Sequence, residues 1–328
     1  MTPQQFLLAL SLTSIYTVTV LTIASLKDED GGLPYNTASL VLFVEFVKCV
    51  ISFGYLAKGS GGHAEDQDLS AAVTSTIKDL QAIEFTKYVR YAVPGLCYCI
   101  NNNLYYLILA NMPAANFQML QNIRVVMTGV TFRFLLQRML SNRQWAASFV
   151  LLFGCMLGQY HPEDTAEANP DEVVTVFGYT LVAIYLCISV FASVYCELLL
   201  KKEPNLHLSN IQLYSWGCIF SIFALIYQGS TEEGGLFKGW DLPHTWAIMI
   251  LQIGQGLTVS RVMKYLDSIY KLFCSAFSNL AVYLVSVFYG VQSLTAQFIG
   301  AFILVCIISL SLALSLSHLQ LIYCYIHT

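Results

Sequence analysis

Residues 116–132, NFQMLQNIRVVMTGVTF, place one cation in the middle of a stretch that is otherwise uncharged and largely apolar. Residues spaced i, i+4, i+7 and i+11 share one face of a helix. That spacing aligns four side chains of the stretch, with Gln118 adjoining: Phe117, Gln121, Arg124 and Thr128. A charge at the centre of a membrane-spanning helix costs about 2.5–3.5 kcal/mol on insertion scales and normally faces the bundle interior. The pattern therefore predicts a polar helix face that meets a ligand or a partner side chain.

Two further cations lie inside apolar segments. Lys48 follows Glu45 by one helical turn, and Lys271 aligns with serines further along its segment. Amides and phenols gather in two other segments: Tyr98, Asn101, Asn102 and Tyr105 in one, and Asn210, Gln212, Tyr214 and Ser215 in the other. Buried cations with few acids at the same depth favour an anionic ligand, since arginine offers a planar fork and lysine a point charge. Amides suit a base or a sugar, and aromatic rings offer stacking faces. A phosphate-bearing nucleotide therefore fits better than a metal ion, an amine or a lipid.

Each of these features also has a structural explanation. Glu45 and Lys48 would neutralise each other at i, i+3 whether or not either contacts a substrate. The three asparagines at 101–103 would equally form hydrogen bonds that hold neighbouring helices together. Arg124 and Lys271 would be satisfied by backbone carbonyls, and a single aromatic residue is more often a packing residue than a ligand-binding one.

The composition places the chain in a membrane. It is 56% hydrophobic and 11% charged, with a net charge of -4 and a mean hydropathy of +0.62, whereas a soluble domain is roughly 45–50% apolar and about 25% charged. The sequence contains no P-loop, GxSxG or HExxH motif, and its histidines and acids lie almost entirely in the joints between apolar segments. We therefore expect no catalytic residue, no metal site and no cofactor, and a function other than that of an enzyme.

The expected fold class is all-α, a polytopic membrane protein with ten transmembrane helices. A span needs about 20 mostly apolar residues, and ten segments qualify, at roughly 4–26, 35–57, 87–110, 113–137, 143–160, 173–200, 208–228, 244–265, 268–289 and 294–317. With a cytosolic N-terminus, eleven Lys and Arg residues fall in cytosolic joints and two in the opposite joints, which favours cytosolic termini. Because each half would contain five spans, an odd number, the second half would have the opposite orientation in the membrane, as in many secondary transporters. The expected domains are a first repeat over 1–160 with a cytosolic linker over 58–86, a second repeat over 173–317, and a cytosolic tail over 318–328.

Six segments resemble the nucleotide-sugar transporters of the drug/metabolite transporter superfamily, and among them the CMP-sialic acid transporter branch with its UDP-sugar carriers and plant relatives. They are EFVK (45–48), AVPGLCYCINNNLYYLILANMPAANFQMLQNIRVVMTG (92–129), LSNRQW (140–145), SVYCELLLKK (193–202), SNIQLY (209–214) and VMKYLDSIYKLF (262–273). The resemblance implies two inverted five-helix repeats around a central cavity in a Golgi or ER membrane. It implies antiport of a cytosolic nucleotide sugar against a lumenal nucleoside monophosphate. Our hypothesis for the mechanism is alternating access. It assigns nucleotide binding to the positions matching Lys48, Asn101, Asn102, the stretch 117–124, Asn210, Gln212, Tyr214 and Lys271, and it adds Ser189.

The sequence departs from that branch at three of these positions. The branch usually has lysine where this chain has Arg124, tyrosine where it has Phe117, and often tyrosine where it has Gln121. Because the charge is kept, we expect phosphate binding to persist, with CMP-sialic acid or a related CMP-sugar carried in exchange for CMP. A UDP-sugar/UMP antiporter is the alternative, since buried polar groups left unpaired reject the wrong substrate.

The sequence is compatible with further functions and predicts which molecules the chain binds. A sugar-phosphate or amine carrier of the same fold is a further alternative, and a non-transport scaffold for glycosyltransferases is another. The expected partners are a nucleotide sugar, a nucleoside monophosphate and the lipid bilayer, with no nucleic acid. The sequence is also compatible with a homodimer.

Overall fold

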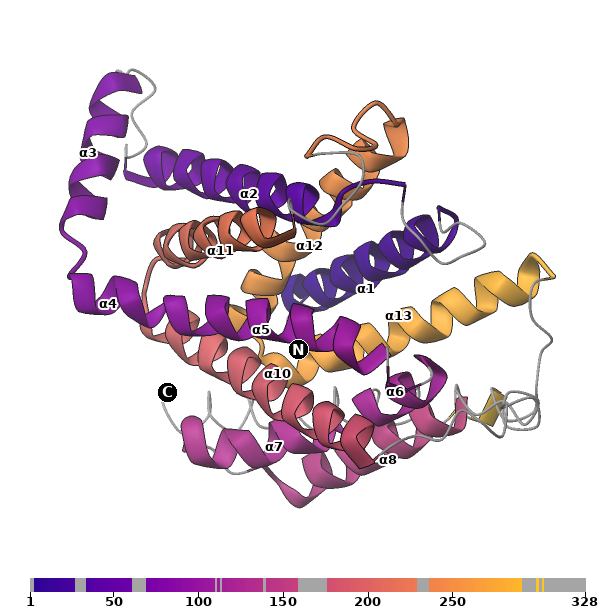
Figure 1. Ribbon diagram of the computed structural model, residues 1–328. Helices are drawn as coiled ribbons and strands as arrows, with labels where there is room; N and C mark the ends of the chain where they lie inside the picture. Colours follow the sequence, from indigo (N-terminus) through magenta and orange to yellow (C-terminus); the bar gives the residue numbers. More distant parts are fainter. Residues whose placement is uncertain are drawn as a thin grey trace. The chain divides into compact units, whose positions relative to one another are not determined.

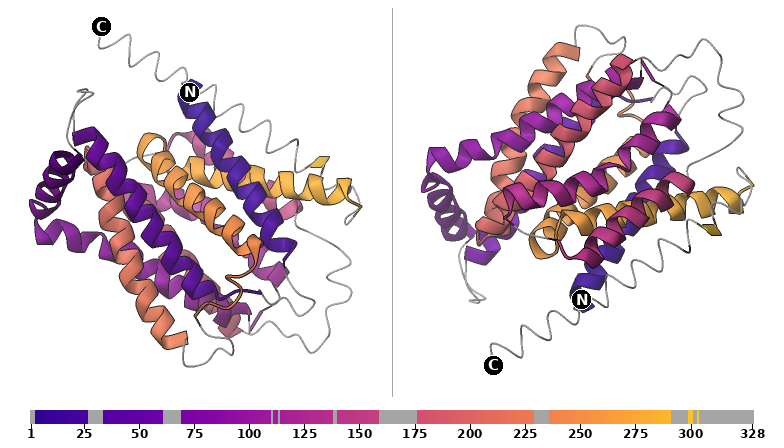
Figure 2. Two further views of the ribbon diagram at one scale, coloured as in Figure 1. Left: turned by 90° about the horizontal axis from the view of Figure 1, so that it is seen from above. Right: turned by 90° about the horizontal axis from the view of Figure 1, so that it is seen from below.

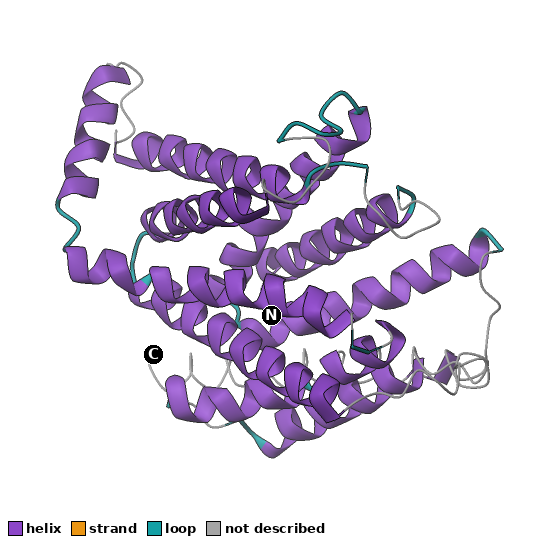
Figure 3. Cartoon of the chain, viewed as in Figure 1, coloured by secondary structure: helices purple, strands orange, loops and turns teal. Residues whose placement is uncertain are grey.

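The fold is helical throughout the part of the chain that the structure describes. This computed structural model describes residues 3–26, 34–60, 69–109, 111–112, 114–137, 140–158, 176–228, 236–290, 299–300 and 303. The helices are α1 (Pro3–Ala24), α2 (Thr37–Ser60), α3 (Leu69–Gln81), α4 (Phe85–Arg90), α5 (Ala92–Leu109), α6 (Ala114–Gln121), α7 (Arg124–Leu135), α8 (Asn142–Gly158), α10 (Val176–Lys202), α11 (Leu206–Gln228), α12 (Pro243–Tyr265) and α13 (Ser268–Phe288) (Figure 1). The described residues contain no β-strand (Figure 3). The expected all-α class is confirmed for the described residues.

Five of the described helices are long and apolar enough to cross a membrane. These stretches are Pro3–Ile23, Thr37–Lys58, Val176–Lys202, Leu206–Tyr227 and Ser268–Phe288. They correspond to expected spans one, two, six, seven and nine. The tenth expected span, 294–317, lies outside the described residues except at three positions, and the arrangement of ten spans in inverted repeats stays a prediction.

The third expected span, 87–110, is divided into α4 and α5 with Tyr91 between them. Pro94 gives the physical reason. Proline has no backbone N–H, and its ring clashes with the carbonyl four residues earlier, which here belongs to Arg90, the last residue of α4.

The fourth expected span, 113–137, is divided into α6 and α7. At the junction the amides of Asn122 and Ile123 donate to the carbonyls of Met119 and Leu120, three residues back, at 3.2 and 3.1 Å. This is 3₁₀ spacing, in which side chains three residues apart eclipse one another. The tighter turn therefore changes which side chains meet at the centre of the expected span.

The segment 58–86, expected as a linker, contains α3. Leu69, Val73, Ile77 and Leu80 recur at intervals of three and four residues, the period of an amphipathic helix. The glycine-rich, acidic run before the helix obscured this pattern at the sequence level. Residues 61–68 of that run lie outside the described residues.

The chain forms two compact units, each assembled from separate segments. Unit 1 comprises the described residues within 1–17, 100–194 and 266–328, and unit 2 comprises those within 18–99 and 195–265. Each unit therefore takes segments from both halves of the chain.

Unit 1 has a core made by α7, α8, α10 and α13. Phe132, Leu151, Val190 and Phe273, one from each helix, are buried together in it. Because lipid tails are as apolar as these side chains, close van der Waals packing is what favours their association within a membrane.

Unit 2 is organised around α2, which runs beside α11 (Figure 2) and also packs on α12. Leu40 and Val44 of α2 are buried against Ile248 and Ile253 of α12. The amide side chain of Asn36 starts α2 by accepting a hydrogen bond from the Ser39 amide at 3.0 Å. This packing fixes the face of α2 that carries Glu45 and Lys48.

Candidate functional site

The junction of α6 and α7 in unit 1 carries Arg124, which is partly buried. The Arg124 guanidinium donates a hydrogen bond to Oε1 of Gln121, three residues earlier, as the 3₁₀ turn favours. Its Nε atom is buried without a hydrogen-bond partner. Among the described residues Arg124 forms no ion pair. The arrangement leaves a positive charge and a free donor for an acceptor that the described side chains do not supply.

Lys271 of α13 is the second cation of unit 1. The Asp267 carboxylate caps α13 by accepting hydrogen bonds from the amides of Ile269 and Tyr270 at 3.0 and 3.1 Å, which fixes the first turn before Lys271. The Lys271 ammonium donates to Oγ of Ser193 on α10 at 2.6 Å. Ser193 lies one turn after Ser189, which is also buried, so α10 presents two hydroxyls on the face that meets Lys271.

The other site candidates of unit 1 differ in what surrounds them. Asn101 is 6% exposed, and its Oδ1 has no hydrogen-bond partner. Phe117 is 1% exposed and packs edge-on against Tyr105 and Tyr185, with ring centroids 5.6 and 5.2 Å away. In this structure Phe117 is a packing residue, and its contact with a substrate stays a prediction. The side chains of Asn102 and Gln118 lie outside the described part of the chain.

In unit 2, Lys48 forms an ion pair with Glu45. Its ammonium lies 2.6 Å from Oε1 of Glu45 and 4.3 Å from the ring centroid of Tyr214. Two glycines make room for the pair: a Cβ on Gly217 would lie 2.7 Å from Oε2 of Glu45, and one on Gly256 would lie 2.7 Å from Cδ of Lys48. The pairing of Glu45 with Lys48, left open at the sequence level, is therefore present, and Lys48 has its negative partner within the protein.

The amide side chains of α11 are the other candidates in unit 2. Asn205 starts this helix by accepting from the amides of His207 and Leu208 at 2.9 and 3.4 Å. Asn210 and Gln212 follow at 1% and 3% exposed, and the Oδ1 of one and the Oε1 of the other have no hydrogen-bond partner. Tyr214 donates from its hydroxyl to the Gly256 carbonyl at 3.3 Å. Tyr98 on α5 is 38% exposed.

Most of the buried side-chain atoms that lack a hydrogen-bond partner belong to predicted site residues. Within the described residues, six buried side-chain N and O atoms lack a partner, and four of them belong to Asn101, Arg124, Asn210 and Gln212. Buried polar groups are nearly always hydrogen-bonded, and an unpaired one costs about 1–3 kcal/mol. In each unit, a free carbonyl oxygen is therefore available to a ligand donor, and in unit 1 the free guanidinium N–H is available to an acceptor.

Two residues near the cations were missed from the sequence. Ser193 contacts Lys271 only through the packing of α10 on α13, 78 positions apart in the chain. Tyr16 on α1 lies within the electrostatic reach of Arg124. Neither has a local signal, because both depend on tertiary packing. The described residues contain no group of His, Cys, Asp and Glu able to hold a metal ion.

Comparison with known proteins connects these residues to a family. A family model described as "Nucleotide-sugar transporter" matches residues 4–312. CMP-sialic acid transporter 1 of Oryza sativa subsp. japonica is 30% identical over 317 residues, which cover 94% of each chain. The probable UDP-sugar transporter protein SLC35A4 of Xenopus tropicalis is 32% identical over 280 residues, covering 84% of this chain and 82% of the relative. UDP-galactose translocator 1 of Caenorhabditis elegans is 30% identical over 285 residues, covering 84% and 78%. One crystal structure of a protein superposes with a TM-score of 0.65 over 93% of this chain and 96% of its own, and at 15% identity it shows a shared fold alone.

Proposed function

Because this chain belongs to the nucleotide-sugar transporter family, we propose that it exchanges a cytosolic pyrimidine nucleotide sugar for a lumenal nucleoside monophosphate. The favoured pair is CMP-sialic acid or a related CMP-sugar against CMP. The relatives named as CMP-sialic acid transporters support this choice.

The observation that carries the proposal is the environment of Arg124. Its guanidinium is bonded to a neutral amide, its Nε is buried and unpaired, and it forms no ion pair within the described residues. A partly buried cation without a compensating anion is unfavourable, whereas phosphate accepts charge-assisted and often bidentate hydrogen bonds from arginine. The nucleotide phosphate is the anion we assign to Arg124, with Lys271 as a second point charge.

Recognition of the base and the ribose is assigned to the unpaired amides. The free oxygen of Asn101 would accept from a base amino group or a ribose hydroxyl, and so would that of Asn210. A buried site that pairs such donors rejects a ligand lacking them. Phe117 and Gln121 replace the tyrosine usual in the resembling branch, which makes a UDP-sugar exchanged for UMP the second candidate. The relatives named as a UDP-sugar transporter and a UDP-galactose translocator favour keeping that candidate.

The proposed mechanism is alternating access by ten spans arranged as two inverted repeats. The loaded carrier switches between the state open to the cytosol and the state open to the lumen, because the bound phosphate offsets the charge of Arg124 and Lys271. The empty carrier would have to make the same change with both cations uncompensated in a low-dielectric interior. Return without a nucleotide is therefore slow, and transport is coupled exchange.

The proposed location is a Golgi membrane with both termini in the cytosol. Eleven Lys and Arg residues in the expected cytosolic joints, against two in the opposite joints, support this orientation. A tag at each terminus should be accessible to antibody when only the plasma membrane is permeabilised, and it should co-localise with a Golgi marker. Protection of either tag would contradict the orientation.

The test of function uses purified protein in liposomes preloaded with CMP, UMP, GMP or buffer. Labelled CMP uptake should be fast into CMP-loaded vesicles, slow into empty ones, and inhibited best by a CMP-sugar. Preference for UMP and UDP-sugars would select the second candidate. Equal uptake into loaded and empty vesicles would contradict coupled exchange. Failure of every nucleotide to exchange, with folded protein, would overturn the transport function.

A further inference from the structure

The ion pair between Glu45 and Lys48 uses only part of the hydrogen-bonding capacity of either side chain. A lysine ammonium has three N–H donors, and a carboxylate has two acceptor oxygens. One bond joins them here, from Nζ of Lys48 to Oε1 of Glu45 at 2.6 Å. Neither side chain forms a further hydrogen bond with another described residue. The ammonium therefore still has donors for a second acceptor.

The two charges belong to one helix, so the pair can open without separating helices. Glu45 and Lys48 are three residues apart on α2, and a change of side-chain rotamer is enough to part them. The packing of α2 on α12 is made by apolar side chains such as Leu40 and Ile248. The carboxylate is the more accessible partner, with 19% of the Glu45 side chain exposed against 8% of Lys48. Glu45 is therefore the side chain that can move away.

Lys48 has contacts that hold it in place without the carboxylate. Its ammonium lies 4.3 Å from the ring centroid of Tyr214 on α11, within the range of a cation–π interaction. Gly256 on α12 lies against its stem, because a Cβ there would be 2.7 Å from Cδ and 3.0 Å from Nζ. All of these groups belong to unit 2. The ring and the glycine confine the ammonium after Glu45 has moved.

The other ion pair in the described part of unit 2 has the opposite pattern of burial. Glu197 and Lys201 on α10 are also 2.6 Å apart, but there the acid is fully buried and the lysine is 29% exposed. In the pair on α2 the cation is the enclosed partner and the acid is the more accessible one. An enclosed cation beside a displaceable acid suits a ligand that supplies its own anion.

We propose that Glu45 is an internal competitor of the nucleotide for Lys48. In the empty carrier the carboxylate neutralises the ammonium. In the loaded carrier an anionic oxygen of the nucleotide takes the place of the carboxylate, and on release the carboxylate returns. Glu45 is thus a positioning residue that acts through Lys48. This inference rests on the proposed function, because it takes the nucleotide as the ligand, and it adds a role for an acid that the proposed function does not use.

Competition of this kind limits how tightly the ligand is held, which favours its release. Only the fraction of carriers in which Lys48 is free binds at full strength, so the apparent Kd is raised by the inverse of that fraction. A hydrogen bond between charged groups corresponds to a factor of about 10 to 100. An amide at position 45 would still offer a neutral acceptor to the ammonium. We therefore expect an effect of about tenfold, at the low end of this range.

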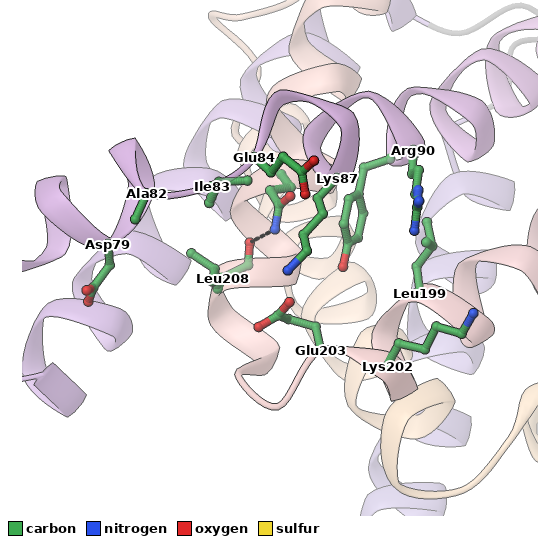
Figure 4. Close-up of a pocket in the computed structure, with 12 residues that line it drawn as sticks. Asp79, Ala82, Ile83, Glu84, Lys87, Arg90, Leu199, Lys202, Glu203 and Leu208 are labelled. Atoms are coloured by element: carbon green, nitrogen blue, oxygen red, sulfur yellow. Dashed lines mark hydrogen bonds between the residues drawn. The ribbon is translucent and has the colours of Figure 1, made fainter.

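Equilibrium binding of labelled CMP to the purified full chain tests the proposal. Glu45→Gln should lower the Kd for CMP about tenfold, because the amide competes less well than the carboxylate for Lys48. Glu45→Asp, which keeps the charge, should lie closer to the wild type. Glu84→Gln is the control and should bind as the wild type does. It removes an exposed acid from a pocket whose lining contains neither member of the pair (Figure 4). An unchanged or higher Kd for folded Glu45→Gln would overturn the competition.

Gly217→Ala tests the same competition with both charges retained. The three atoms nearest to the new Cβ, at 2.7, 3.0 and 3.1 Å, all belong to the flexible side chain of Glu45. The carboxylate should therefore move off Lys48 while the backbone stays, and CMP should bind about threefold more tightly or better. Gly54→Ala, with no atom within 4 Å, is the control. If Glu45→Gln does not fold, wild-type affinity in folded Gly217→Ala would overturn the proposal.

A double-mutant cycle shows whether Glu45 acts through Lys48. Lys48→Met should weaken CMP binding, and adding Glu45→Gln should then leave the Kd unchanged. Tightening by Glu45→Gln in the Lys48→Met background would contradict the proposal, because the effect would not pass through the lysine.

Exchange kinetics in liposomes give a readout that a purely structural role would not produce. Glu45→Gln should lower KM for CMP about tenfold and lower kcat with it, because release becomes slower. Wild-type KM and kcat in Glu45→Gln, beside an active wild type, would refute the competition and leave the transport function intact. A folded wild type that neither binds nor exchanges any nucleotide would remove the proposed function itself.

Discussion

The ion pair between Glu45 and Lys48 makes a quantitative prediction about stability. Their charged atoms are 2.6 Å apart, with the Lys48 side chain 8% exposed and that of Glu45 19% exposed. Removing one partner of a buried pair leaves an uncompensated charge, which costs about 3–5 kcal/mol, whereas replacing both by apolar residues is often neutral. Glu45→Ala should therefore lower the free energy of unfolding by about 3 kcal/mol or more. The double variant Glu45→Ala/Lys48→Met should lower it much less.

A double-mutant cycle measures this coupling. The free energy of unfolding is obtained from SDS titration in mixed micelles for the wild type, Glu45→Ala, Lys48→Met and the double variant. Lys58→Met, an exposed lysine at the end of the same helix, is the matched control and should be close to wild type. A double variant as unstable as Glu45→Ala would refute the reasoning, because it would show that lost packing, and not the unpaired lysine, sets the cost.

The same variants separate two roles for Lys48. If its ion pair is structural, the double variant should still bind CMP with an affinity close to that of the wild type. Loss of CMP binding from a stable double variant would assign Lys48 to the substrate, as the family resemblance implies.

Two further predictions follow from close contacts in the structure. Gly256→Ala should lower the free energy of unfolding by about 1–3 kcal/mol, as overpacking does, because the new Cβ would lie 2.7 Å from Cδ of Lys48; Gly54→Ala, with no atom within 4 Å, should be neutral or stabilising in the same titration. Ser193→Ala should raise KM for nucleotide by up to about tenfold, because it removes a hydrogen bond to a charged group; an unchanged KM would show that the 2.6 Å contact does not position Lys271.

Long apolar segments were predictable because a membrane helix leaves a continuous hydrophobic run. The expected spans 4–26 and 268–289 match α1 and α13 to within two residues at each end. Breaks within the expected helical spans were less predictable. The break before α5 has a local cause, Pro94, which is visible in the sequence itself. The 3₁₀ junction at Asn122 has no proline or glycine to mark it, since it depends on the packing around it.

Site residues were predictable where a polar side chain had to be buried in an apolar run. Arg124 and Asn210 were identified in this way, and each has a buried, unpaired atom. Partners supplied by another helix were not predictable, because periodicity describes one helix at a time. The contact of Ser193 with Lys271 depends on how α10 meets α13. A pocket lined by Arg90 and Lys202 likewise brings together segments more than 100 residues apart.

Exchange by Arg124 variants tests the central claim most directly. CMP-loaded liposomes containing wild type, Arg124→Ala, Arg124→Lys or Arg133→Ala are compared for uptake of labelled CMP, with Arg133 serving as an exposed arginine on the same helix. We expect Arg124→Ala to lose about 10- to 100-fold in kcat/KM, the equivalent of the 1.5–3 kcal/mol of a hydrogen bond to a charged group. Arg124→Lys should retain most of the activity, and Arg133→Ala should match the wild type. Wild-type exchange by folded Arg124→Ala would contradict the binding of the nucleotide phosphate by this arginine.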